Sequence, residues 1–242
     1  MKRYFSVLMI AARSTIYKIT GLLLLMGAAE AALFYRLLQK SAAEGPAPLE
    51  SLITRSRLSL ICGLAFFLLC VILSLVGYEF SGSKTRYTIQ RLSLPEEAAV
   101  LLWAFYNMLC FLIFWAAQLL VVLLLCRLYI SVMEPTYWNR QTIFLAFYRS
   151  GFLHSLLPLE ETSRWLRNGA LILGLGLAGA CFPLKQRRGQ KGLAMAVLAA
   201  LTFITFPQEM GSFGSDAIIM LIALGTAAYS FYGIWWGPRD ES

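Results

Sequence analysis

The chain has 242 residues, of which 59% are hydrophobic and 14% are charged, and its formal net charge is +8. Globular domains carry roughly 45–50% apolar and about 25% charged residues, so this composition argues against an ordinary water-soluble domain and indicates a membrane protein. The basic residues are scattered between apolar runs and form no single stripe. Nucleic acid is therefore not expected as a partner, and contact with anionic lipid headgroups explains the charge more simply.

Cysteine and histidine usage argues against metal and disulfide chemistry. The five cysteines all fall inside or at the ends of apolar runs, without a CxxC spacing: Cys62, Cys70, Cys110, Cys126 and Cys181. We interpret them as small apolar packing residues. Because His154 is the single histidine of the sequence, a multi-histidine metal site is excluded. We predict no cofactor, no metal ligand and no catalytic residue in this chain.

The first part of the chain predicts an interfacial helix followed by two membrane spans. Residues 1–14 carry Lys2, Arg3 and Arg13 among apolar residues, a pattern typical of a helix lying at the headgroups. The first span is expected over about 17–39. A Gly-Pro-Ala-Pro loop at 45–48 then breaks the helix, and the second span covers about 58–78.

A polar segment at 79–97 leads into a very long apolar run at about 98–128. Ser93 and Glu96 have the spacing of a capping box, Pro95 is tolerated in a first turn, and Glu96 and Glu97 suit the positive end of a helix dipole. The predicted third span is on the order of 45 Å long, which exceeds a hydrocarbon core of roughly 30 Å.

Residues 130–167 form the largest segment outside the predicted spans. Pro135 is expected to end the third span. The segment 143–157 mixes apolar with polar residues and is too short for a span. It therefore either lies in the interface or re-enters the membrane partway. Glu160 and Arg164, four residues apart with the acid first, favour a helical turn that leads into the fourth span.

Three further spans complete the prediction. The fourth, about 168–184, contains Gly169, Gly174, Gly176 and Gly179 and should pack closely on a neighbour. The fifth and sixth cover about 192–206 and 217–236. The predicted fold is all-α: one transmembrane domain over 1–242 with six spans, the interfacial helix 1–14, and the segment 130–167 between spans three and four.

The charges of the short loops predict the orientation. Residues 184–191 hold four basic side chains (Lys185, Arg187, Arg188 and Lys191), whereas 207–216 hold none. Under the positive-inside rule the first loop is cytoplasmic and the second external. Both termini and 79–97 are then expected inside, 40–57 and 130–167 outside, in a multi-pass protein of the plasma (inner) membrane.

Motifs of hydrolytic chemistry are missing from the sequence. It contains no GxxxxGK[ST] phosphate loop, no HExxH and no GxSxG. Glu160-Glu161 with Arg164 looks like the paired-glutamate motif of membrane-embedded CAAX-type proteases, but those place the arginine one residue later and need further histidines. We therefore interpret this stretch as a solvated helix start, and we do not expect an enzyme.

The topology and the 79–97 segment together resemble the permease subunits of type-2 ATP-binding-cassette (ABC) exporters. Members often show an acid leaving the second span, a turn, a Leu-rich stretch and a proline opening the third span; here these are Glu79, Gly82, 88–94 and Pro95. The family usually has its large external element between spans five and six, whereas this chain has it between spans three and four.

The resemblance implies a transporter built from two kinds of subunit. Separate ABC ATPase subunits would bind the cytoplasmic face, and 79–97 would act as a coupling segment through these residues: Glu79, Arg86, Arg91, Ser93, Pro95, Glu96 and Glu97. A second permease, the same or a sister chain, would complete the pathway for an amphipathic cargo such as a peptide, an antibiotic or a lipid. An alternative is a non-transporting scaffold or assembly subunit, in which 79–97 is only a solvated connector.

Glu30 is the one acid well inside a predicted span, among small residues that let another helix approach. An acid at this depth is expected to face the bundle interior and to find a partner. Counted from the cytoplasmic ends, Glu30 lies about 20 Å along its span, Asn107 about 13 Å and Gln118 about 30 Å. Asn107 is thus the expected partner. The acid is either protonated and hydrogen-bonded between helices, or it is a polar site in the cargo path or a proton-linked switch.

Overall fold

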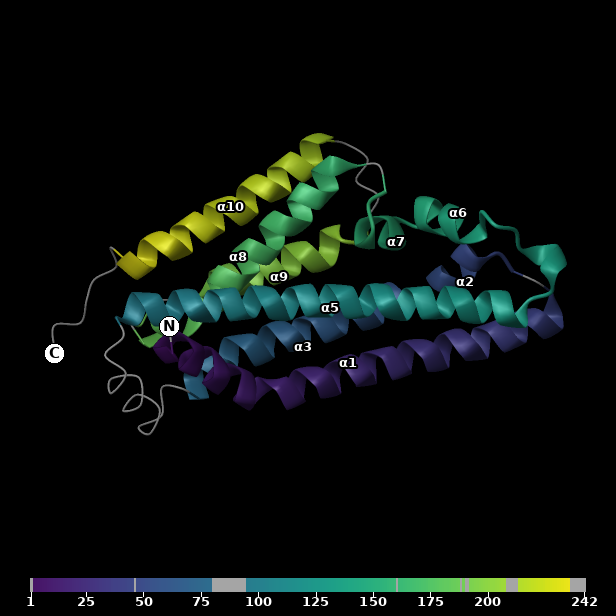
Figure 1. Ribbon diagram of the computed structural model, residues 1–242. Helices are drawn as coiled ribbons and strands as arrows, with labels where there is room; N and C mark the ends of the chain where they lie inside the picture. The colour runs from purple at the N-terminus through teal and green to yellow at the C-terminus, as the bar shows by residue number, and fades with distance from the viewer. Residues whose placement is uncertain are drawn as a thin grey trace.

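The computed structural model describes residues 2–45, 47–79, 95–159, 161–187, 189, 192–207 and 213–235, and within them every regular element is helical. Long helices lie side by side in a bundle, with α8, α9 and α10 on one flank of α5, and α1 on the other (Figure 1). The all-α fold predicted from the sequence is confirmed for this part of the chain.

Five helices of the described residues are long and apolar enough to cross a membrane, which makes this a multi-pass membrane protein by length and composition. They are α1 (Lys2–Glu44), α3 (Leu58–Glu79), α5 (Glu96–Val132), α8 (Thr162–Arg187) and α10 (Phe213–Trp235). The predicted fifth span corresponds to α9 (Leu193–Thr205), which has only 13 residues. At 1.5 Å per residue α9 is about 20 Å long, less than a hydrocarbon core of roughly 30 Å.

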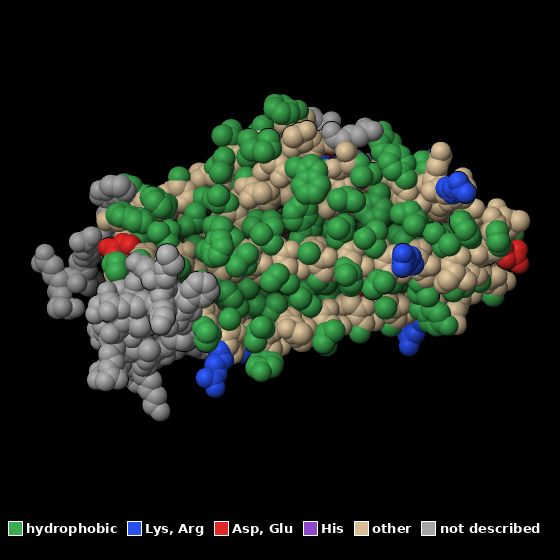
Figure 2. Space-filling view, in the orientation of Figure 1, with side chains coloured by type: hydrophobic (Ala, Val, Ile, Leu, Met, Phe, Trp, Pro, Cys, Tyr) green, Lys and Arg blue, Asp and Glu red, His purple; other side chains and the backbone are tan. Residues whose placement is uncertain are grey.

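Hydrophobic side chains cover most of the face seen in Figure 2, across α10, α5 and α1, and few charged groups interrupt them. Exposed leucines of α5 are typical of this surface: Leu109, Leu112, Leu120, Leu123 and Leu124. Such a broad apolar surface is unfavourable in water and suits contact with lipid tails. The outside of the bundle therefore agrees with the membrane assignment.

Two helix starts differ from the sequence-based expectation. α1 is a single helix from Lys2, so the predicted interfacial helix 1–14 is continuous with the first span. α5 begins at Glu96 with Pro95 at the N-cap position and no side-chain cap, so the start predicted at Ser93 is two residues early. Pro95 fixes an extended backbone before the helix, which makes it a natural boundary. Ser93 itself lies outside the described residues.

The segment 130–167 is built from short helices. After α5 come η1 (Pro135–Tyr137), α6 (Thr142–Arg149) and α7 (Gly151–Leu156). The Trp115 indole of α5 donates to the Leu156 carbonyl of α7 at 2.8 Å. Trp115 precedes Val132, the last residue of α5, by about 25 Å of helix. The chain therefore runs back alongside α5 before α8 begins.

α2 (Leu49–Arg55) and α6 lie beside the far ends of α1 and α5 (Figure 1). The Tyr129 hydroxyl donates to the Ala47 carbonyl at 3.1 Å, and Arg149 of α6 pairs with Glu50 of α2 at 3.2 Å. The first contact joins the connection between α1 and α3 to the end of α5, and the second joins it to α6.

Glycines bring α8 close to its neighbours, as its sequence predicts. A Cβ added to Gly174 would lie 2.9 Å from the Ala223 carbonyl oxygen of α10, and one on Gly176 would lie 3.1 Å from the Ala104 oxygen of α5. Real Cβ atoms essentially never come closer than 3.0 Å to another atom and seldom closer than 3.4 Å, so α8 packs this closely on α10 and α5 because these positions have no side chain.

Candidate functional site

A pocket of about 100 Å³, partly open to the outside of the bundle, lies between α3, α5, α7, α8 and the end of α9. We call it the central chamber. Three helices each contribute residues at the spacing i, i+3, i+4 and i+7, which places them on one helical face. The lining residues from these helices are Ser59, Cys62, Gly63 and Phe66 of α3; Phe111, Phe114, Trp115 and Gln118 of α5; and Asn168, Leu171, Ile172 and Leu175 of α8.

Aromatic rings make up much of the wall of the central chamber. Phe66 of α3 lies 5.9 Å from Phe111 and 6.2 Å from Phe114 of α5, between ring centroids. Phe152 of α7 and Phe206, just after α9, contact each other edge to face at 6.1 Å and also line the chamber. Tilted and edge-to-face contacts of this kind are favourable for aromatic pairs. Aromatic rings from α3, α5, α7 and the residue after α9 therefore form an apolar wall of the chamber.

Gln118 joins the chamber to a buried acid. Its amide nitrogen donates to both carboxylate oxygens of Glu30 at 3.0 Å, and both residues are fully buried. Gln118 lines the chamber, whereas Glu30 lies behind it on α1. The amide oxygen Oε1 of Gln118 is buried and has no hydrogen-bond partner.

The prediction that Asn107 is the partner of Glu30 is therefore wrong, because the partner is Gln118. Asn107 instead donates to the Gly176 carbonyl of α8 at 3.4 Å. The depth expected for Glu30 was measured from residue 17, because residues 1–14 were expected to lie flat in the interface. Because α1 is continuous from Lys2, Glu30 stands about 42 Å along it and Gln118 about 33 Å along α5, whereas Asn107 stands only about 17 Å along α5.

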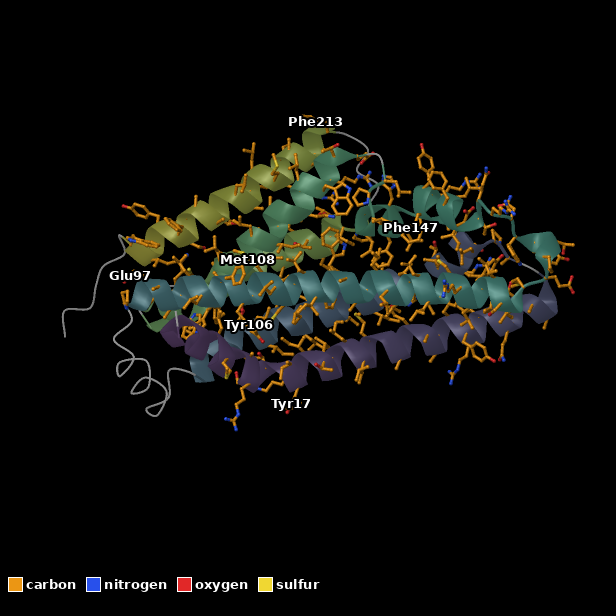
Figure 3. All side chains as sticks on the ribbon, in the orientation of Figure 1. Tyr17, Glu97, Tyr106, Met108, Phe147 and Phe213 are labelled. Atoms are coloured by element: carbon orange, nitrogen blue, oxygen red, sulfur yellow. The ribbon has the colours of Figure 1, made fainter. Side chains whose placement is uncertain are left out.

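A second contact fixes the same pair of helices. The hydroxyls of Thr15 in α1 and Tyr106 in α5 lie 2.6 Å apart. Figure 3 shows Tyr106 on the side of α5 that faces α1 and Met108 on the side that faces α8. Residues of α5 thus alternate between an α1 side, with Tyr106 and Gln118, and an α8 side, with Asn107 and Met108.

Polar side chains of α8 and α10, together with a backbone carbonyl of α7, form a cluster at one end of the chamber. Arg167 donates to Asp216 at 2.9 Å and also to the Asn168 oxygen, while the Asn168 amide donates to the Ser155 carbonyl at 3.0 Å. Ser163 donates to the same Asp216 carboxylate at 3.1 Å. Asn168 belongs to both the cluster and the chamber wall. Sequence reasoning missed this cluster, although Arg167 and Asp216 each stand at the edge of an apolar run.

The expected pair of Glu160 and Arg164 is not tested, because Glu160 lies outside the described residues; Arg164 contacts the neighbouring Glu161. His154 of α7 lies 3.8 Å from the same Glu161 carboxylate. Among the described residues no three histidine, cysteine or acidic side chains come together as a metal site would require.

Only some of the predicted coupling residues lie in the part of the chain that the structure describes. Glu79 is the last residue of α3, Pro95 and Glu96 begin α5, and Glu97 is half-buried in its first turn. These two helix ends lie at the same end of the bundle as the α8–α9 connection and the end of α10 (Figures 1 and 3). Arg86, Arg91 and Ser93 lie outside the described residues.

Comparison with protein-family models, with curated proteins and with solved structures finds no match for this chain. The class that the fold defines is thus a multi-pass helical membrane protein with an aromatic internal chamber, and any finer assignment depends on the chemistry of its residues.

Proposed function

We propose that this chain is a membrane-spanning permease subunit of an ABC-type exporter, which moves an amphipathic molecule with energy from a separate ATPase subunit. The central chamber is the observation that carries the proposal. It lies within a bundle of long apolar helices, it has aromatic walls, and the polar side chains of Gln118 and Asn168 face it from α5 and α8. Binding sites for small molecules are typically apolar cavities with a few placed polar groups.

The same proposal assigns a role to the end of the bundle where α3 ends and α5 begins. An ATPase subunit would dock on 79–97, and a push on Pro95 and Glu96 would be transmitted along α5, whose Phe111, Trp115 and Gln118 line the chamber. In this arrangement α9 serves as the sixth membrane segment, both termini and 79–97 face the cytoplasm of the plasma membrane, and a second permease chain completes the pathway.

Site-specific crosslinking tests the docking surface. A photoreactive amino acid at Glu97 should capture a phosphate-loop ATPase, identified by mass spectrometry, from the native membrane. The same probe at Thr136, an exposed residue of η1 beyond the other end of α5, is the matched control and should not capture it. Arg91→Glu should weaken the Glu97 crosslink, because it reverses the charge within the proposed docking segment.

A scaffold or assembly subunit gives a different result. It would yield no ATPase at Glu97, and Arg91→Glu would leave its complexes and the ATPase activity that accompanies them unchanged. Equal capture of the ATPase at Glu97 and Thr136 would also contradict the proposal, because contact would then not be specific to the 79–97 end.

A further inference from the structure

We infer that the central chamber binds a small organic cation: a protonated amine carried on an apolar body about the size of one aromatic ring. That such a molecule is also exported cargo rests on the proposed function; its binding to the chamber does not.

The first argument is the charge balance around Glu30. Both carboxylate oxygens of Glu30 lie 3.0 Å from the Gln118 amide nitrogen, so within the described residues the hydrogen bonds to this acid come from a neutral amide. Among the described residues Glu30 makes no ion pair, and its side chain is fully buried. A buried carboxylate is costly without a positive partner. A cation in the adjacent chamber would supply the missing charge.

The second argument is the free acceptor on Gln118. The amide nitrogen of Gln118 is occupied by Glu30, and the buried Oε1 atom has no hydrogen-bond partner. A buried acceptor without a partner is unfavourable, so a ligand that donates a hydrogen bond here is favoured over one that only accepts. An ammonium group has three donors and no acceptor, which suits this position.

The third argument is the wall itself. Phe66, Phe111, Phe114 and Trp115 line the chamber next to Gln118, and aromatic faces attract cations. The cavity of about 100 Å³ is somewhat smaller than an engineered apolar cavity of ~150 Å³ that accepts benzene. A ring-sized amine would therefore fill the space completely and require a small outward shift of the wall side chains, whereas a peptide or a whole lipid would need the helices to separate.

The test uses three ligands of similar shape and different charge on the parent protein. The purified chain is placed in nanodiscs of uncharged (zwitterionic) lipid, and binding of radiolabelled 2-phenylethylamine is measured with empty nanodiscs subtracted. Unlabelled 2-phenylethanol and phenylacetate are the competitors. We expect the amine to bind at least about tenfold more tightly than the alcohol, the size of one hydrogen bond to a charged group, and phenylacetate to bind weakest.

Variants then locate the site. Glu30→Gln keeps a hydrogen-bonding side chain and removes the charge, so it should weaken amine binding about tenfold and change alcohol binding by less than about twofold. Ile172→Trp adds bulk to the chamber wall and should abolish binding of both ligands. Its matched control is Leu173→Trp, the adjacent exposed position that does not line the chamber, which should bind like the parent.

Several outcomes overturn the inference. It fails if the parent does not bind the amine, if the alcohol or phenylacetate binds as tightly as the amine, or if Ile172→Trp binds like Leu173→Trp. The competitor series needs no variant, so a misfolded variant cannot hide a failure. Because this chain is measured without an ATPase, absence of binding overturns only this inference, and absence of an ATPase crosslink overturns only the proposed function.

Discussion

Arg167 in α8 donates to the carboxylate of Asp216 in α10 across 2.9 Å, with the two side chains only 1% and 3% exposed. Both residues stand near the first turns of their helices, and the two helices run side by side in the same direction (Figure 1). The pair therefore fixes the register of α10 on α8, the helix that forms one wall of the chamber.

Removing either member of this pair should destabilise the bundle strongly. Arg167→Met leaves a buried carboxylate without its cation, and Asp216→Leu leaves a buried guanidinium without its anion; each should cost roughly 3–5 kcal/mol of unfolding free energy. The double substitution should recover much of the loss, because no uncompensated charge remains. Unfolding in mixed micelles with increasing denaturing detergent measures the three variants.

The exposed pair of Arg149 and Glu50 is the control for this experiment. Its side chains are 61% and 30% exposed at a separation of 3.2 Å, so Arg149→Met should cost less than about 1 kcal/mol. Equal losses of unfolding free energy for Arg149→Met and Arg167→Met would show that burial of the Arg167–Asp216 pair does not increase its contribution to stability.

A second prediction concerns the glycines of α8. Gly174→Ala places a Cβ where the Ala223 carbonyl oxygen would be 2.9 Å away, so α8 and α10 must move apart, at a cost of about 1–3 kcal/mol. Gly169→Ala is the matched control on the same helix, because nothing lies within 4 Å of its added Cβ. That change should be neutral or stabilising, by up to ~1 kcal/mol from helix propensity. Thermal unfolding of both variants in one detergent tests the difference, and equal behaviour would contradict the close approach.

Long apolar runs made the main helices predictable. The run from Ala98 to Leu128 and the glycine-rich run from Asn168 both correspond to long helices, because burial of the backbone in lipid requires internal hydrogen bonds. The length of α9 shows the limit of this signal: the fifteen residues 192–206 predict a short span, and the helix that forms there has 13 residues. Where an apolar run is short, composition does not distinguish a crossing helix from a buried one.

The chamber was harder to predict for a physical reason. The i, i+3, i+4, i+7 pattern of Phe111, Phe114, Trp115 and Gln118 is visible in the sequence, but all faces of α5 are apolar, so the pattern does not say which face points inward. The rotation of each helix is set by contacts between helices, such as Tyr106 with Thr15. The wrong choice of Asn107 for Glu30 came from the same missing information.

A third prediction tests the orientation. In a background without the five native cysteines, all of which are buried, Thr136→Cys in η1 and Gln186→Cys in the last turn of α8 place single exposed thiols near opposite ends of the bundle. Thr136→Cys should react with a membrane-impermeant thiol reagent in intact cells, and Gln186→Cys only after lysis. The expectation comes from the basic loop 184–191. Reversed labelling would place 79–97 outside and remove it from contact with any cytoplasmic ATPase.

The last prediction separates the shape of Glu30 from its charge. Glu30→Gln keeps an oxygen that can accept from Gln118, so unfolding should change by no more than about 1 kcal/mol. Glu30→Leu leaves the buried Gln118 amide without its partner and should cost about 1–3 kcal/mol, and adding Gln118→Leu should restore part of that loss. Glu134→Leu, at an exposed acid before η1, is the control and should have little effect. Stability of the four variants and the parent is measured by unfolding in the same micelles. If Glu30→Leu is as stable as the parent, the contact with Gln118 contributes nothing to packing α1 on α5. A buried carboxylate retained without a structural benefit would then have to be explained by binding alone.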